Sequence, residues 1–250
     1  MSAGEIVDID DPGGWPEDVR EFVASLAGTV PARVRDGGDL PYEVDLATRD
    51  AELRTLLAGR WLRSFHATRL LAHEVEGVRA SGLRRLTEAL VEGRQDEALR
   101  HGAITPEEHA ALRNSSVFKW GKRVGLRTGK VCLVANAQPL HEMAGNFAPL
   151  LKNWGGEAQY MTNAWEQLDC ERVKKLGTPS LVVAWLDVAD PGVAVGVGHE
   201  LIYAFVASHL GMANVRSRID FESDIPSGCI EGVWQPGSCG YDQFTGLPRS

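Results

Sequence analysis

Cysteine is scarce in this chain of 250 residues, and long apolar runs are missing. The four cysteines form no Cys-x-x-Cys pair, so the spacing typical of structural zinc sites is absent. So few cysteines favour a reducing compartment over a disulfide-linked scaffold. Since no run reaches eighteen apolar residues, we expect no transmembrane helix, and the acidic N-terminus is unlike a secretory signal. These features predict a cytoplasmic protein.

Several motifs that would identify a catalytic class are incomplete. The second histidine of a zinc protease is missing after each of three His-Glu pairs, at His73, His141 and His199. Gly125-x-x-x-Gly129-Lys130 is one residue short of a phosphate-binding P-loop. No Gly-x-Ser-x-Gly elbow and no complete dinucleotide fingerprint occurs. The sequence therefore argues against metalloprotease, P-loop, serine hydrolase and Rossmann functions.

Acidic charge is concentrated in residues 1–59, which carry 13 acidic and 5 basic side chains. Residues 60–250 hold 21 of each sign. An acidic leader is typical of a solubilising or partly disordered arm. We therefore predict an N-terminal extension over 1–59 and a main domain over 60–250. Inside the extension, apolar spacing and first-turn acids predict short helices over 16–26 and 48–59.

The stretch Arg63-Ser-Phe-His-Ala-Thr-Arg69 is the most informative part of the chain. Alternation over 61–67 predicts a strand. The apolar spacing from Leu70 predicts a helix that ends at Gly82, because glycine adopts positive φ readily. A strand that ends in His-x-Thr-Arg at a helix start would bring an imidazole, a hydroxyl and a guanidinium together. This set suits a ligand with phosphates and ribose hydroxyls; the alternative is a core histidine beside a solvated arginine.

His66-Ala-Thr-Arg69, followed by Gly82-Leu83, resembles the first motif of the ADP-ribosyltransferase fold in its poly-ADP-ribose polymerase-like form. With the later Trp154-Gly-Gly-Glu157, the chain is similar over residues 60–237 to a set of bacterial proteins. The resemblance implies an α+β fold around a split, mixed, mostly antiparallel sheet with helical insertions, and the absence of regular βαβ repeats favours the same class.

The resemblance also implies a reaction. ADP-ribose would move from NAD, a co-substrate, to a protein or nucleic acid acceptor, or NAD would be hydrolysed. Nicotinamide is released in both cases, without a metal, in a bacterial toxin, effector or defence protein. The residues implied to bind NAD are His66, Ala67, Thr68, Arg69, Asn136, Trp154, Gly155 and Gly156. His66 is also expected to be catalytic, through a hydrogen bond to the ribose.

A catalytic carboxylate is expected at Glu157. Cleavage of the nicotinamide–ribose bond passes through an oxocarbenium-like state, which a fixed carboxylate stabilises. The alternative is a surface glutamate beside a packing tryptophan. Glu231, on a final strand predicted over 230–234, is the rival, because a late strand carries the catalytic glutamate in many transferases of this fold. Glu200 is a third candidate. The chain departs from the family at Asn136, where a tyrosine often follows the second strand.

Two further features leave other functions open. Amphipathic patterns predict a helical insertion over about 86–115, with Thr105 and Glu108 in the positions of a capping box. Residues 118–130 then hold five basic and two aromatic side chains, which suit a phosphate, a nucleic acid strand or a solvated loop. The alternatives are therefore an RNA 2′-phosphotransferase-like enzyme of the same fold, or a non-catalytic module that binds ADP-ribose or a partner.

Overall fold

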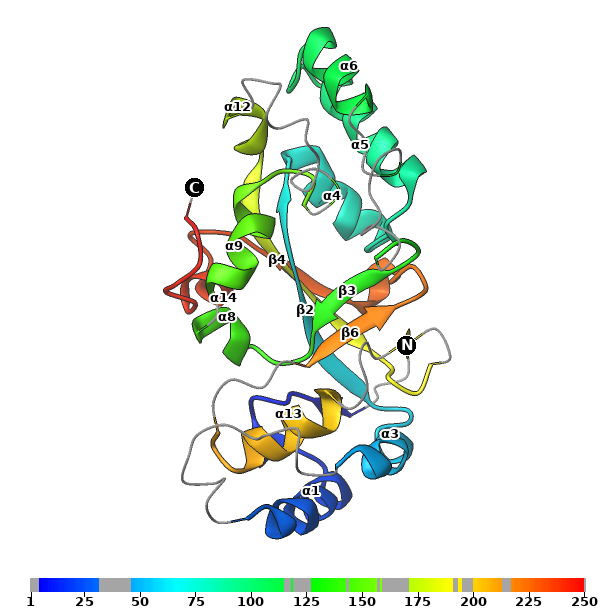
Figure 1. Cartoon of the computed structure of the whole chain (residues 1–250), viewed down its shortest axis with the longest axis vertical. Coiled ribbons are helices and arrows are strands. Elements are labelled where there is room, and N and C mark those ends of the chain that lie inside the picture. Colours follow the sequence, from blue (N-terminus) through cyan, green and yellow to red (C-terminus); the bar gives the residue numbers. More distant parts are fainter. Residues whose placement is uncertain are drawn as a thin grey trace.

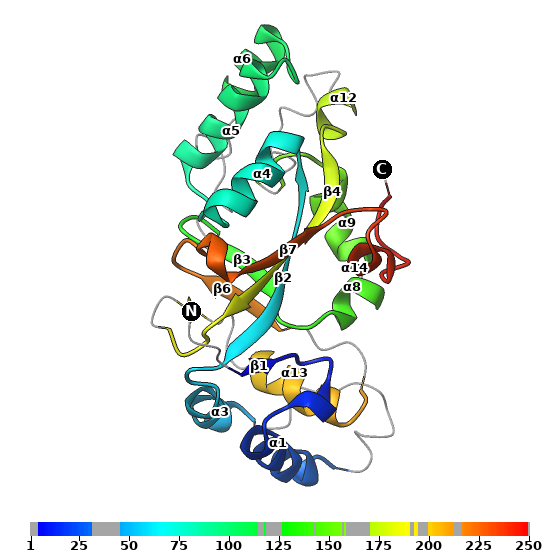
Figure 2. The same ribbon diagram turned by 180° about the vertical axis from the view of Figure 1, so that it is seen from behind.

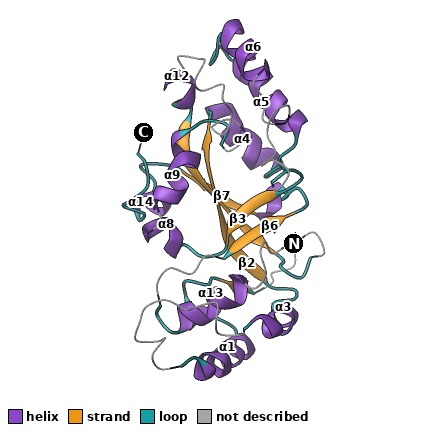
Figure 3. Ribbon diagram, viewed as in Figure 1, coloured by secondary structure: helices purple, strands orange, loops and turns teal. Residues whose placement is uncertain are grey.

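The computed structural model describes residues 5–31, 46–114, 118, 127–142, 144–156, 158, 171–190, 193–194, 200–212 and 217–249. These residues form one sheet surrounded by helices (Figures 1 and 3). The helices α5 and α6 lie at one end of the molecule, and α1, α3 and α13 lie at the other (Figure 1). None of the helices in these ranges is long and apolar enough to cross a membrane.

The sheet is antiparallel except at one short strand. Its order is β5-β6-β3-β2-β4-β7, and β1 pairs with β2 in parallel. The strands are β1 Ile6–Val7, β2 Trp61–Leu70, β3 Val131–Val134, β4 Thr178–Leu186, β5 Val193–Ala194, β6 Arg218–Phe221 and β7 Ile230–Trp234. This topology confirms the mixed, mostly antiparallel α+β class expected from the sequence, in place of a parallel doubly wound sheet.

The central strand β2 is paired very unequally on its two edges. It pairs with β4 at every position from Leu62 to Leu70. With β3 it shares a single register pair, Phe65 opposite Val134. Beyond Phe65 the two strands separate, and β3 continues with β6 as its partner. The sheet is therefore split along one edge of β2, directly beside His66.

Helices cover the sheet from several directions. The helix α9 packs on β2 and β4, and α4 lies against β7, which is seen from behind in Figure 2. The α-helices of the described segments are α1 Glu17–Thr29, α3 Asp50–Leu56, α4 Ala72–Ser81, α5 Glu88–Arg100, α6 Pro106–Asn114, α8 Gln138–Glu142, α9 Ala144–Lys152, α12 Glu171–Lys174, α13 Glu200–His209 and α14 Cys239–Asp242.

The helices predicted within about 86–115 are present as α5 and α6, which pack on each other. Thr87 caps α5, since its hydroxyl accepts from the amide of Leu90. Before α6, the amide of Thr105 donates to Glu108, and the amide of Glu108 donates back to the Thr105 hydroxyl. This reciprocal pair is the capping box that the sequence predicted.

The described part of the acidic leader, residues 5–31 and 46–59, packs against the rest of the chain and forms no separate arm, which differs from the sequence prediction. The strand β1 extends the sheet, and α1 packs on α13. Val19, Phe22 and Val23 of α1 are buried in the same core cluster as Ile202 and Phe205 of α13. Charge counting misled the prediction because the acidic side chains occupy the outer face of α1 and the apolar face is buried.

Gly82 ends α4 with φ of +88° and ψ of −164°, a conformation that is essentially restricted to glycine. A Cβ atom there would lie 1.9 Å from the carbonyl oxygen of Ile225. We expect Gly82→Ala to lower the free energy of unfolding by at least about 2 kcal/mol, as measured by denaturant unfolding. Gly28→Ala is the control, because a Cβ on this helical glycine would meet nothing within 4 Å. That change should be neutral or stabilise by up to about 1 kcal/mol; an equal loss in both variants would contradict the prediction.

Candidate functional site

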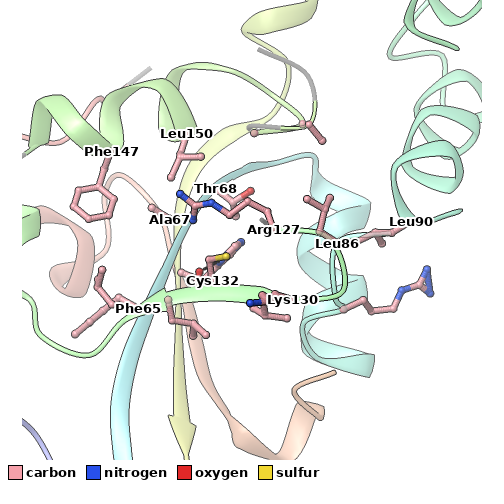
Figure 4. Close-up of a pocket in the computed structure, with 18 of the residues that line it drawn as sticks. Phe65, Ala67, Thr68, Leu86, Leu90, Arg127, Lys130, Cys132, Phe147 and Leu150 are labelled. Atoms are coloured by element: carbon pink, nitrogen blue, oxygen red, sulfur yellow. Dashed lines mark hydrogen bonds between the residues drawn. The ribbon is translucent and has the colours of Figure 1, made fainter. Parts of the chain in front are cut away.

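A cavity of about 270 Å³ lies in the split beside β2, and we call it the split cavity. Phe147 and Leu150 of α9 border it on one side, and Leu86 and Leu90 at the start of the insertion border it on the other (Figure 4). Arg127 lies between these two apolar walls (Figure 4). The cavity is thus open to a ligand with both apolar and charged parts.

The lining of this cavity is strongly cationic. No carboxylate lines it among the residues that the structure describes. The cationic side chains come from four separate parts of the chain and are Arg84, Arg94, Arg127, Lys130 and Arg218. A site with this lining favours an anionic ligand.

His66 lies at the point where β2 and β3 separate. Its Nδ1 is 2.9 Å from the carbonyl oxygen of Cys132 on β3. A carbonyl only accepts, so Nδ1 carries the hydrogen and Nε2 of the neutral ring is an acceptor. Burial lowers the pKa of His66, although the bond to Cys132 opposes this shift. The ring therefore offers an acceptor nitrogen at neutral pH, and the residue lines the cavity.

Ala67 and Thr68, which the sequence analysis expects to bind NAD, also line the split cavity. A second cavity of about 340 Å³ lies on the α4 side and shares His66, Thr68 and Arg94 with the first. The two cavities therefore adjoin each other at the His-x-Thr segment.

Arg69 has a different role from the predicted one. Its guanidinium donates to three main-chain carbonyls, those of Leu176 at 2.7 Å, Lys175 at 2.6 Å and Leu151 at 3.2 Å. The residue is 4% exposed and lines neither cavity. Its donors already hold the end of α9 to the segment before β4, so the structure corrects its assignment as a binder of anionic oxygens.

Asn136 and Trp154 are likewise buried outside the split cavity. The Asn136 carbonyl oxygen accepts from the Ser217 hydroxyl, and the Trp154 indole donates to Glu74 at 3.0 Å. Neither side chain lines the cavity, so both predicted contacts with NAD are corrected to packing roles. Gly155 and Gly156 do line it, with φ of +85° and +57°.

Glu157 lies outside the described residues, so its predicted role stays a prediction. Its neighbours in the chain on both sides, Gly156 and Ala158, line the split cavity. The rival Glu231 is described and lies elsewhere. Its carboxylate accepts from Arg63 at 2.7 and 3.0 Å and from the Trp185 indole at 3.0 Å.

Glu231 therefore holds together three neighbouring strands of the sheet and lines neither cavity. The side chain of the third candidate, Glu200, is outside the described part of the chain.

Several cavity residues were missed in the sequence. Arg84 and Arg94 lie far from Arg218 in the chain, and nothing in the spacing of the three signals a common site. Phe147, an aromatic residue of α9, was also missed. The basic stretch over 118–130 did give a signal, since Arg127 and Lys130 belong to it.

No group of three histidine, cysteine or acidic side chains that could hold a metal occurs in the ranges described. Comparisons with protein-family models, with curated proteins and with solved structures give no match.

One buried carboxylate connects the parts of the site. Glu74 accepts from Arg94 at 2.5 Å, from the Trp154 indole at 3.0 Å and from the Leu71 amide at 2.7 Å. Arg94 belongs to the helical insertion, Leu71 precedes α4, and Trp154 precedes Gly155. Burial alone would raise the pKa of Glu74, but Arg94 and the hydrogen bonds hold it below its usual value. Glu74 therefore links the insertion, through Arg94, to the start of α4 and to the segment that precedes Gly155.

Removing this charge should loosen that junction. We expect Glu74→Gln to lower the free energy of unfolding by about 1–3 kcal/mol, because Arg94 loses its charged partner in a mostly buried setting. Glu76→Gln on the same helix is the control, since its pair with Arg79 is exposed and contributes little. Denaturant unfolding of both variants at pH 7 checks this; a Glu76 effect as large as the Glu74 effect would contradict it.

Proposed function

We propose that the chain binds NAD in the split cavity and cleaves it at the nicotinamide–ribose bond. ADP-ribose then passes to an acceptor, as in the ADP-ribosyltransferases that the sequence resembles, or to water. The observation that carries the proposal is the state of His66, a neutral imidazole whose acceptor nitrogen belongs to a residue lining a cationic cavity. A ribose hydroxyl would donate to Nε2, while the Nδ1 bond to Cys132 keeps the ring oriented.

Two glycines that line the cavity also support the proposal. Gly155 and Gly156 have no side chains to fill the space and adopt positive φ, so their backbone offers close approach to a ligand. Glu157 follows them directly and is the carboxylate we assign to the developing positive charge on the ribose. The described residues that line the cavity supply no other carboxylate, and Glu231 is bound to Arg63.

The assignment of the carboxylate can be tested with a matched pair of variants. Glu157→Gln keeps the shape and loses the charge, so nicotinamide release should fall by about 100-fold, roughly 3 kcal/mol, with little change in NAD affinity. Glu231→Gln should act mainly through stability, since it weakens the contacts with Arg63 and Trp185. Nicotinamide release is measured for both at equal folded concentration. Loss of release in Glu231→Gln with normal release in Glu157→Gln would reverse the assignment.

The role of His66 predicts a characteristic pH dependence. Only the neutral ring accepts a hydroxyl at Nε2, and burial places its pKa below the usual 6.5. Affinity for ADP-ribose should therefore be constant from pH 8 to about 6.5 and weaken as the pH falls through the lowered pKa. His66→Ala should weaken the binding of ADP-ribose by about 10-fold and remove this pH dependence. Calorimetry across the pH range checks both expectations.

The proposed reaction requires no metal, so a chelator should leave nicotinamide release unchanged. Loss of release with the chelator would refute the metal-free mechanism.

The same assay separates the two other functions that the sequence left open. A non-catalytic module would bind ADP-ribose and release no nicotinamide from NAD. An RNA 2′-phosphotransferase-like enzyme would release nicotinamide only when a 2′-phosphorylated RNA is present. Nicotinamide release in the absence of RNA supports the function proposed above.

A further inference from the structure

The floor of the split cavity is one face of the β3–β6 pair. The two strands run antiparallel with Cys132 opposite Asp220 and Val134 opposite Arg218. Because side chains alternate along a strand, these four residues share a face, and Lys130 joins it from the position before β3. The opposite face, with Leu133 and Ile219, is buried in the main core.

Two cations on this face are fixed by a single buried carboxylate. Asp220 is 3% exposed, and its oxygens accept from Arg218 at 2.7 and 2.6 Å. Lys130 Nζ lies 3.7 Å from the same carboxylate and 3.5 Å from Glu222. The Glu222 side chain is about half exposed, so water screens its attraction. One buried carboxylate thus holds both Arg218 and Lys130 in place.

A third cation comes from a different wall. Arg84 lines both cavities and has no ion pair within 4 Å among the described residues. Its neighbour Arg85 bonds Asp224 at 3.2 Å and the carbonyl of Glu222 at 3.1 Å, and it lines neither cavity. Two adjacent arginines therefore differ in one respect that matters: only Arg84 is available to a ligand in the cavity.

We infer that Arg84, Lys130 and Arg218, with Arg127 beside them, form a subsite for a diphosphate group. Guanidinium groups bind phosphate oxygens through paired hydrogen bonds, and partial burial of the cations reduces competition from water. A cavity of about 270 Å³ exceeds the space that an isolated phosphate requires, and the cations reach it from three segments of the chain. The expected occupant is the diphosphate of NAD, and this identification of the ligand rests on the proposed function. The subsite itself is inferred from the positions of the cations alone.

The subsite can be tested by calorimetry with the full chain and three probes: ADP-ribose, inorganic pyrophosphate and adenosine. Arg84→Gln should weaken the binding of both phosphate-bearing probes by about 10-fold, and Lys130→Gln should do so to a similar extent. Arg85→Gln is the matched control and should leave both affinities unchanged. Affinity for ADP-ribose should also fall as salt is raised from 50 to 300 mM, and adenosine should bind much more weakly than ADP-ribose.

The outcomes separate the subsite from the proposed reaction. Arg84-dependent binding of pyrophosphate and ADP-ribose without nicotinamide release would support the subsite and overturn the reaction. Nicotinamide release with the same KM for NAD in Arg84→Gln, Lys130→Gln and Arg85→Gln would overturn the subsite and leave the reaction standing. Equal affinity for adenosine and ADP-ribose would also overturn the subsite, because a diphosphate that contributes nothing to binding is not recognised.

Discussion

The hydrogen bond between His66 and the carbonyl of Cys132 is the interaction on which the site depends. A strand that loses its neighbour exposes backbone groups that need partners. Where β2 and β3 separate after Phe65, the imidazole of His66 supplies the next link between them. The same bond holds the two walls of the split at a fixed separation and sets the tautomer of the ring. One hydrogen bond therefore both joins β2 to β3 at the split and determines which ring nitrogen of His66 can accept from a ligand.

The alternation of β2 decides what each motif residue does. His66 and Thr68 are two apart and line both cavities. Arg69 is out of phase with them and lies on the side that α9 covers, together with Phe65 and Ala67. Phe65 and Ala67 still border the split cavity from there, whereas the Arg69 guanidinium is bound by main-chain carbonyls. The sequence analysis assigned Arg69 to ligand binding because it predicted that the strand ends at Ala67 and that a helix begins directly afterwards. The strand continues to Leu70, since β4 pairs along its full length, so a strict period of two applies.

Features that depend on neighbouring residues could be predicted from the sequence. The meeting of side chains from distant segments could not. The Thr105 capping box and the glycine stop at Gly82 each follow from neighbouring residues, and each is present. The cationic lining is different, because Arg84, Lys130 and Arg218 have no common spacing. The pairing of β3 with β6 brings Lys130 and Arg218 together, and Arg84 follows Leu83, which bridges Ile225. The acidic leader was misjudged for a related reason: its apolar face has a partner, α13, that lies about 180 residues further along the chain.

The cations of the cavity repel one another, so something must hold them in place before a ligand arrives. Two carboxylates do so. Glu74 receives Arg94, an indole and an amide, and Asp220 receives Arg218 and Lys130. Burying a carboxylate costs free energy that only several hydrogen bonds to it offset, and both have them. Arg94, Arg218 and Lys130 are thereby ordered in the empty protein, and a phosphate ligand would not have to order these three when it binds, which is how preorganisation raises affinity. Arg94 belongs to the helical insertion and lines the cavity. A shift of the insertion relative to α4 would therefore also move one of the positive charges of the cavity.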